Sequence, residues 1–276
     1  MATRLITVLL AERFLEMAFP DYPTAFWFCA AAAVLLFGIS KAGFGSGIGI
    51  LATPLLSLSI PVTEAVGLLL PLLLITDVFA LWHYRSRFDS RSIKILVPAA
   101  CLGIAAGAFF FDYFRGNLET LQFSIGVVAL LFVLFQAFRS LILGAIEKRR
   151  PTSAEGILMG AASGFISTLA HAGGPPVLMY LLPQKLEKAL FVGTTVIFFA
   201  SVNLIKLLPY CALGLPRAGD TKVILILAPL TYVGVRLGVY LNRRFSDLWF
   251  NRVVYGILFL TGLQLILGRN LLSLIF

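Results

Sequence analysis

The chain has 276 residues, of which 59% are hydrophobic and 13% charged, and its mean hydropathy is +0.96. A soluble globular domain carries about 25% charged and about 45–50% apolar residues, so this composition excludes an ordinary soluble domain and is typical of an integral membrane protein. The formal net charge of +9 comes from basic residues that flank apolar segments, which argues against a nucleic-acid partner.

Residues 1–24 are predicted to form an interfacial N-terminal segment rather than a signal peptide. The apolar run from Leu5 to Ala11 is short, and charged residues follow it without a small-residue cleavage site. We expect an amphipathic helix at the membrane surface, ended by Pro20 and Pro23.

Eight apolar blocks follow and predict an all-α polytopic membrane protein. Six have roughly the 20 residues that a helix needs to cross ~30 Å of hydrocarbon. The first and the fifth are longer and interrupted, by "GFGSGIG" and by "HAGGPP". Because glycine and proline disfavour helix interiors, each long block should form two pieces, which gives up to ten helical pieces. The blocks are about 25–60, 62–82, 93–111, 118–138, 154–183, 187–209, 222–241 and 249–268.

The pattern of glycines and prolines indicates an internal duplication. In both interrupted blocks a Gly-Phe pair precedes a proline by eleven residues, counted from the glycine. Each half would then contain one broken element and three full transmembrane helices, an architecture typical of secondary transporters. The matched pairs are Gly43 and Gly164, Pro54 and Pro175, Gly67 and Gly193, Tyr84 and Tyr210, Pro98 and Pro229, and Gly126 and Gly256.

The duplication divides the chain into two homologous transmembrane repeats, at 25–138 and 154–268, with a tail over 269–276. The basic segment 139–153 links the repeats, and the positive-inside rule places it in the cytoplasm together with the basic loop 85–94. The charges of the other loops hardly separate inverted from parallel repeats. We favour inverted repeats because they give the symmetry of an alternating-access carrier.

The stretches "KAGFGSGIGILATPLL" and "GFISTLAHAGGPPVLMYLL" resemble the twin motifs of the TauE/SafE sulfite-exporter family, also called the TSUP family. Its members carry Gly-Phe, a glycine cluster and a Pro-x-Leu or similar close once per half. The resemblance extends from about residue 25 to 268 and implies permeation of a small anion, chiefly sulfite, a sulfonate or another organosulfur compound. In the first half, Gly45 to Gly49 replace a tighter glycine run, a departure that bears on the substrate more than on the fold.

The paired breaks are the predicted substrate site. A helix start exposes unpaired amides and about half a positive charge, so one start after Gly49 and another after Pro176 would both face an anion. Glycines let the backbone approach the anion, and nearby hydroxyls add donors; the alternative is that the glycines only permit close helix packing. The predicted substrate-binding residues at the breaks are Lys41, Gly43, Gly45, Ser46, Gly47, Gly49, Pro54, Ser167, Thr168, His171, Gly173, Gly174 and Pro175.

Three ionisable residues are candidates to neutralise the anion, because a charge inside the bilayer is costly unless it serves a function or has a partner. Lys41 precedes the first break, His171 opens the second, and Arg236 lies within the seventh block. Each has a structural alternative. Lys41 would extend to the interface, His171 would be a packing hydrogen bonder, and Arg236 would belong to an ion pair.

Asp77 is the plainly intramembrane carboxylate of the sequence, and Asn203 occupies the matching position of the second half. Asp77 would carry a coupling proton or form a structural ion pair with Lys206 or Arg236. Both roles stay open at this point, and we include Asn203 among the substrate-binding residues.

These features predict a secondary active transporter for a small anion in the plasma (inner) membrane, with a proton or a sodium ion as the coupling ion and a homodimer as an open option. The first alternative is an anion channel that uses the breaks as a filter. An intramembrane enzyme is disfavoured because Ser46 lacks the G-x-S-x-G arrangement, and a non-transporting scaffold is a further alternative. No cofactor is expected, and the scattered cysteines predict no metal site.

Overall fold

The computed structural model describes most of the chain, and every regular element within the described residues is helical. The predicted site residues Lys41, Gly43, Gly45, Ser46 and Gly47 lie outside them, as do nearly all of the predicted N-terminal segment, linker and tail. The described residues are 22–39, 48–84, 87–138, 142, 150–216, 220–244 and 247–267.

The helices follow the apolar blocks closely, and the two interrupted blocks each form more than one helix. Proline stays inside several long helices, as at Pro98 in α5 and Pro229 in α11. The elements are α2 (Thr24–Ile39), η2 (Ile48–Leu51), α3 (Ala52–Leu56), α4 (Val62–Tyr84), α5 (Ser90–Phe114), α6 (Leu118–Ala137), α8 (Ser153–Ala170), α9 (Gly174–Leu181), η3 (Leu182–Gln184), α10 (Lys188–Ala212), α11 (Asp220–Arg244) and α12 (Asp247–Leu267).

Five of the described helices, α4, α5, α6, α10 and α11, are long and apolar enough to cross a membrane, while α2 and part of α12 are shorter apolar helices. Large apolar side chains also cover the outer surface, among them Phe28, Leu102, Phe109 and Leu208. Such a belt is unfavourable in water and suits hydrocarbon. The prediction of an all-α polytopic membrane protein is therefore confirmed.

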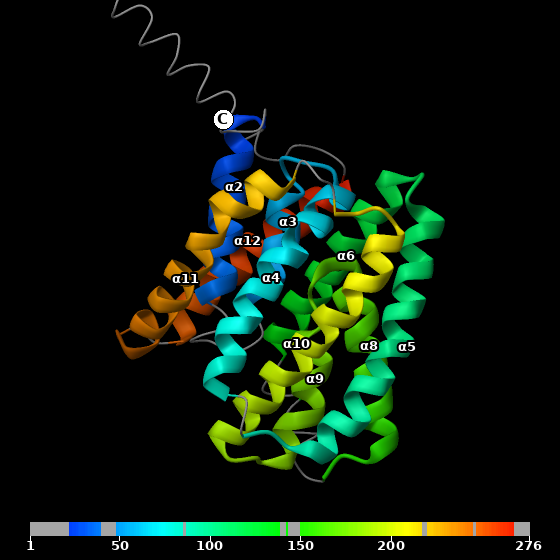
Figure 1. Ribbon diagram of the computed structural model, residues 1–276, viewed down its shortest axis with the longest axis vertical. Coiled ribbons are helices and arrows are strands. Elements are labelled where there is room, and N and C mark those ends of the chain that lie inside the picture. The colour runs from blue at the N-terminus through cyan, green and yellow to red at the C-terminus, as the bar shows by residue number, and fades with distance from the viewer. Residues whose placement is uncertain are drawn as a thin grey trace, which may run out of the picture.

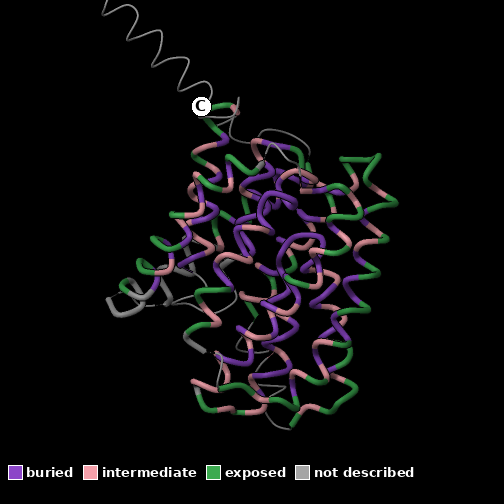
Figure 2. The backbone as a smooth tube through the Cα atoms, in the orientation of Figure 1, coloured by how far each residue is buried: buried purple, intermediate pink, exposed green. Residues whose placement is uncertain are grey.

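The first and second halves of the chain interlock. The helix pairs with the most extensive contacts are α5 with α8, α2 with α11, α4 with α10, and α6 with α12, and each pair joins the two halves. In Figure 1 the α2–α11 pair lies at the left and α5 and α8 at the right, with α4 and α10 between them. Buried residues gather in this middle region (Figure 2). Each broken element therefore packs against helices of the other half.

Glycines allow the outer helix pairs to touch backbone to backbone. A Cβ added to Gly38 of α2 would lie 2.9 Å from the backbone of Gly234 in α11. On α8, a Cβ added to Gly160 would lie 2.7 Å from the carbonyl oxygen of Leu96 in α5. Any side chain at these positions would push the helices apart, so close packing is one role of the glycines in this protein.

Polar side chains cap the starts of helices that position the second break. Thr152 and Glu155 form a reciprocal capping box at the start of α8, which satisfies two amides that no helical carbonyl can reach. Asp89 accepts the amide of Ser92 at the start of α5, at 2.8 Å. The starts of α5 and α8 are therefore each fixed by local bonds.

Candidate functional site

The fifth apolar block is broken as predicted, between α8 and α9. Helix α8 ends at Ala170, His171 takes a left-handed backbone conformation with φ of 53°, and α9 begins at Gly174 after the N-cap Gly173. The prediction that the second half-helix begins after Pro176 is wrong. Prolines fit a first helical turn because the amide that they lack would have no partner there. They also leave fewer backbone donors for an anion at this start than the sequence suggested.

Side chains of α10 cap the carboxyl end of α8. The ammonium of Lys206 donates to the carbonyl oxygen of Ser167 at 3.1 Å and to its Oγ at 3.0 Å. The hydroxyl of Tyr210 donates to the carbonyl oxygen of Thr168 at 2.7 Å, and its ring centroid lies 5.9 Å from Lys206 Nζ. The Ser167 carbonyl also accepts the amide of His171 at 3.0 Å, whereas the Thr168 carbonyl lies in the last turn, where carbonyls have no helical partner; the helix dipole favours a cation at this end. The end of α8 therefore stabilises the positive charge of Lys206, whose side chain is fully buried.

His171 ties the break to two further helices. Its Nδ1 lies 2.8 Å from Lys206 Nζ, and its Nε2 lies 3.0 Å from the carbonyl oxygen of Val66 in α4. Because an ammonium can only donate, Nδ1 accepts, and Nε2 carries the hydrogen that is donated to Val66. The bonding pattern therefore assigns a neutral imidazole in one tautomer. His171 and Lys206 form one network that joins α4, α10 and the end of α8.

Asp77 and Asn203, which the predicted duplication pairs, are brought together. Nδ2 of Asn203 donates to Oδ2 of Asp77 at 2.6 Å, across the contact between α4 and α10, and both side chains are buried. Asn203 precedes Lys206 by three residues on α10, so the two side chains share one helix face. That face carries the polar contacts of α10 both to α4 and to the second break.

Helix α3, which follows the first break, contacts the end of α8 at the second break. Thr53 of α3, which follows the first break, donates from its hydroxyl to the carbonyl oxygen of Ala170 at the end of α8, at 2.8 Å. The neighbouring Pro54 is buried in α3, and Gly49 lies in the 3-10 helix η2. Sequence reasoning missed Thr53, although it lies within the first motif, because nothing in its spacing indicates a partner 117 residues away.

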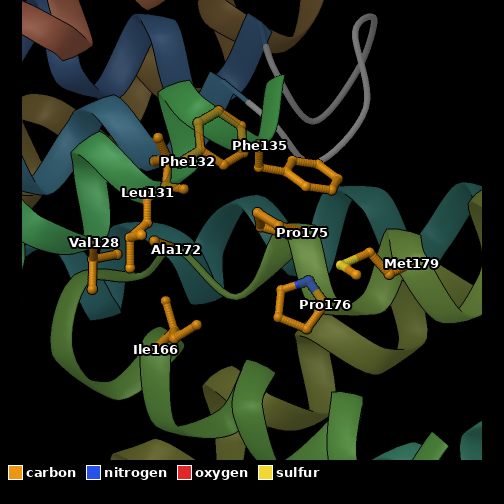
Figure 3. Close-up of a pocket in the computed structure, with 10 residues that line it drawn as sticks. Val128, Leu131, Phe132, Phe135, Ile166, Ala172, Pro175, Pro176 and Met179 are labelled. Atoms are coloured by element: carbon orange, nitrogen blue, oxygen red, sulfur yellow. The ribbon is translucent and has the colours of Figure 1, made fainter. Parts of the chain in front are cut away.

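A pocket of about 190 Å³ opens where the second break, η2 and α6 come together (Figure 3). The view shows Pro175 and Pro176 at the start of α9 facing side chains of α6 across the pocket. Every lining side chain is apolar, and Ala172 in the wall directly follows His171. The lining residues are Ile50, Val128, Leu131, Phe132, Phe135, Ile166, Ala172, Pro175, Pro176 and Met179.

Comparison with known proteins identifies the family. The family model described as Sulfite exporter TauE/SafE matches residues 30–265. The chain belongs to this family. No curated protein and no solved structure gives a significant match. A TauE/SafE protein is a membrane transporter with a small anionic substrate, so the family favours transport over catalysis.

Some of the predicted site residues have other roles in this TauE/SafE protein. The hydroxyl of Thr168 donates to the carbonyl oxygen of Gly164 in its own helix at 2.8 Å, so that bond occupies the donor that was expected to reach an anion. The carbonyl oxygen of Gly173 accepts from the hydroxyl of Ser163 at 2.6 Å, a contact that sequence reasoning did not anticipate. These bonds stiffen the break from inside.

Arg236 is not brought to the second break. Its side chain is exposed on α11, which packs chiefly on α2 and α4. The structure shows no hydrogen bond or ion pair between Arg236 and another described residue. The cation that the structure places beside the second break is Lys206, which the sequence predicted only as a coupling or ion-pair residue.

Proposed function

We propose that this TauE/SafE protein is a secondary active transporter of an organosulfur anion and that the anion binds where the two helix breaks meet. The observations that support the proposal are the contact of α3 with the end of α8, the apolar pocket beside the second break and the buried Lys206. Thr53 connects α3 with the second break, and Ala172 of the pocket wall directly follows His171, which contacts Lys206.

The buried cation supports an anionic substrate. A positive charge inside a membrane protein is costly without compensation, and Lys206 is held beside the unwound segment rather than at the membrane surface. An anion that approaches the break would meet a fixed positive charge in surroundings of low dielectric constant, where electrostatic attraction is stronger than in water. This argument favours anions over neutral or cationic solutes.

The pocket supports a sulfonate with an organic tail over sulfite itself. Its apolar wall offers no hydrogen bonds to compensate for the lost hydration of an inorganic anion. An alkyl group in the same place gains about 0.8 kcal/mol for each buried methylene. We therefore place the organic tail in the pocket and the sulfonate group toward the break.

The interlocked helices support an arrangement as two repeats. Exchange of the halves turns the α5–α8 pair into the α11–α2 pair and leaves the α4–α10 and α6–α12 pairs unchanged. Under that exchange Asp77 and Asn203 trade places, and a pseudo-two-fold axis would pass close to their hydrogen bond. We propose inverted repeats that rock against each other around the breaks, in a protein of the plasma (inner) membrane.

The test combines binding and exchange. Purified protein is heated with methanesulfonate, longer alkyl sulfonates, sulfite, sulfate or acetate, and a ligand at 100 times its dissociation constant should add about 2.7 kcal/mol of stability. Counterflow of a labelled sulfonate in proteoliposomes then separates a carrier from a channel, because a channel gives ohmic current without counterflow. Stabilisation by acetate but by no sulfur anion would contradict the proposed substrate class.

A further inference from the structure

We propose that the ammonium of Lys206 takes the place of a coupling sodium ion, so that transport is driven by protons and does not require sodium. The inference rests on the proposed function, because it assumes that the breaks form the transport site. In carriers with broken helices, unwound carbonyls and the carboxyl ends of half-helices coordinate the coupling sodium ion or proton. Here that end of α8 is occupied by a cation that belongs to the chain itself.

The acceptors around Lys206 fit an ammonium. Its Nζ lies 2.8 Å from Nδ1 of His171, 3.0 Å from Oγ of Ser167 and 3.1 Å from the Ser167 carbonyl oxygen. These three atoms can receive the three N–H groups of the cation. A carbonyl and a hydroxyl at a helix end are also ligands that suit a small metal cation, and the Lys206 side chain is fully buried against them. The position is therefore filled without an ion from solution.

Protonation of Lys206 would bias the conformation of the break. With the proton present, the ammonium holds α10 to the carboxyl end of α8. When an N–H bond breaks, the electron pair stays on Nζ and the proton passes to water that reaches the break, so no positive charge remains at the end of α8. The neutral amine no longer compensates the α8 dipole, so α10 and α8 can separate. Proton binding thus favours one state of the carrier, which is the condition for coupling.

Other titratable groups face this pair from neighbouring helices, so the pH dependence belongs to a network rather than to one residue. Tyr210 of α10 lies beside both Lys206 and His171. On α4, Asp77 bonds Asn203, one turn of α10 away from Lys206.

The decisive measurement is sulfonate uptake into proteoliposomes under imposed gradients. We expect a pH gradient to drive uptake equally in sodium chloride and in choline chloride, and a sodium gradient at equal pH to drive none. Uptake that requires sodium would overturn the inference. Counterflow at equal pH distinguishes failure of the proposed function from failure of the present inference. If counterflow is absent, the proposed function is wrong; if counterflow occurs but requires sodium, only the present inference is wrong.

A variant tests the occupied position directly. Lys206→Ser vacates the end of α8, so pH-driven uptake should fall at least tenfold, and sodium chloride should raise the melting temperature of the variant more than choline chloride does. Lys94→Ser, which removes an exposed lysine of α5, is the matched control and should behave as the unmodified protein. Unchanged pH-driven uptake in Lys206→Ser would overturn the inference. If that variant does not fold, the sodium comparison on the unmodified protein still decides it.

Discussion

Asn203 of α10 donates its side-chain amide to the carboxylate of Asp77 in α4, and the bond of 2.6 Å joins the two halves of the chain near their centre. The α4–α10 contact is the place where repeats that rock against each other would pivot. A polar bond at a pivot specifies one register of two helices, which apolar packing alone specifies less sharply.

Removal of the amide should weaken this contact. We expect Asn203→Ala to lower the free energy of unfolding by about 1–3 kcal/mol, because a buried carboxylate oxygen loses its donor. The measurement is denaturant unfolding in detergent. Ser201→Ala, whose hydroxyl bonds only to the Ile197 carbonyl of its own helix, should cost less. Equal effects of the two changes would show that the Asp77 contact adds no stability.

The link between the breaks should matter for transport as well as for stability. Thr53→Val keeps the shape of the side chain but removes the bond to Ala170, so the end of α8 loses a cap and can move away from α3. We expect slower sulfonate counterflow and a lower melting temperature. Thr76→Val is the control, since Thr76 is equally buried but bonds only to Leu72 in its own helix. Counterflow reduced alike in both variants would contradict a role for the link.

Substitution of a glycine at a backbone-to-backbone helix contact should destabilise the protein. A Cβ on Gly164 would lie 2.9 Å from Cα of Ala100, so Gly164→Ala should cost about 1–3 kcal/mol, as overpacking does. Gly256 of α12 has open space at the same position, and Gly256→Ala should be neutral or stabilising by up to about 1 kcal/mol through helix propensity. Thermal unfolding of both variants checks the contrast, and a stable Gly164→Ala protein would contradict it.

The pocket predicts how affinity depends on the substrate tail. From methanesulfonate to butanesulfonate, affinity should rise about fourfold for each added methylene, which corresponds to about 0.8 kcal/mol. Ala172→Leu fills the pocket from its wall and should abolish this gain, while Leu208→Ala on the exposed face of α10 should leave it intact. Thermal-shift titrations give the dissociation constants. Affinities that do not change with tail length would place the tail elsewhere.

Apolar periodicity and the interruptions were sufficient to predict the helices and the second break, because both are local properties of the chain. The predicted start of α9 was wrong, because a proline pair ends a helix in most positions and is favourable only in the first turn. The caps on α8 from Thr53, Lys206 and Tyr210 could not be predicted, because they depend on helices that pack together far from each other in the sequence. Arg236 was predicted as a site residue from its charge alone, and only the packing of α11 shows that its side chain is exposed.

The interlocking of the halves has a consequence for how the protein is made. Helix α5 finds its main partner, α8, only after the intervening chain has been synthesised, and α2 must wait for α11. Until then the glycine faces of α2 and α5 have no partner helix and face lipid or the insertion machinery. The first half on its own therefore lacks most of its helix contacts. Contacts so distant in sequence slow assembly and expose intermediates to degradation. Each half is therefore protected from proteolysis only after both halves have been synthesised.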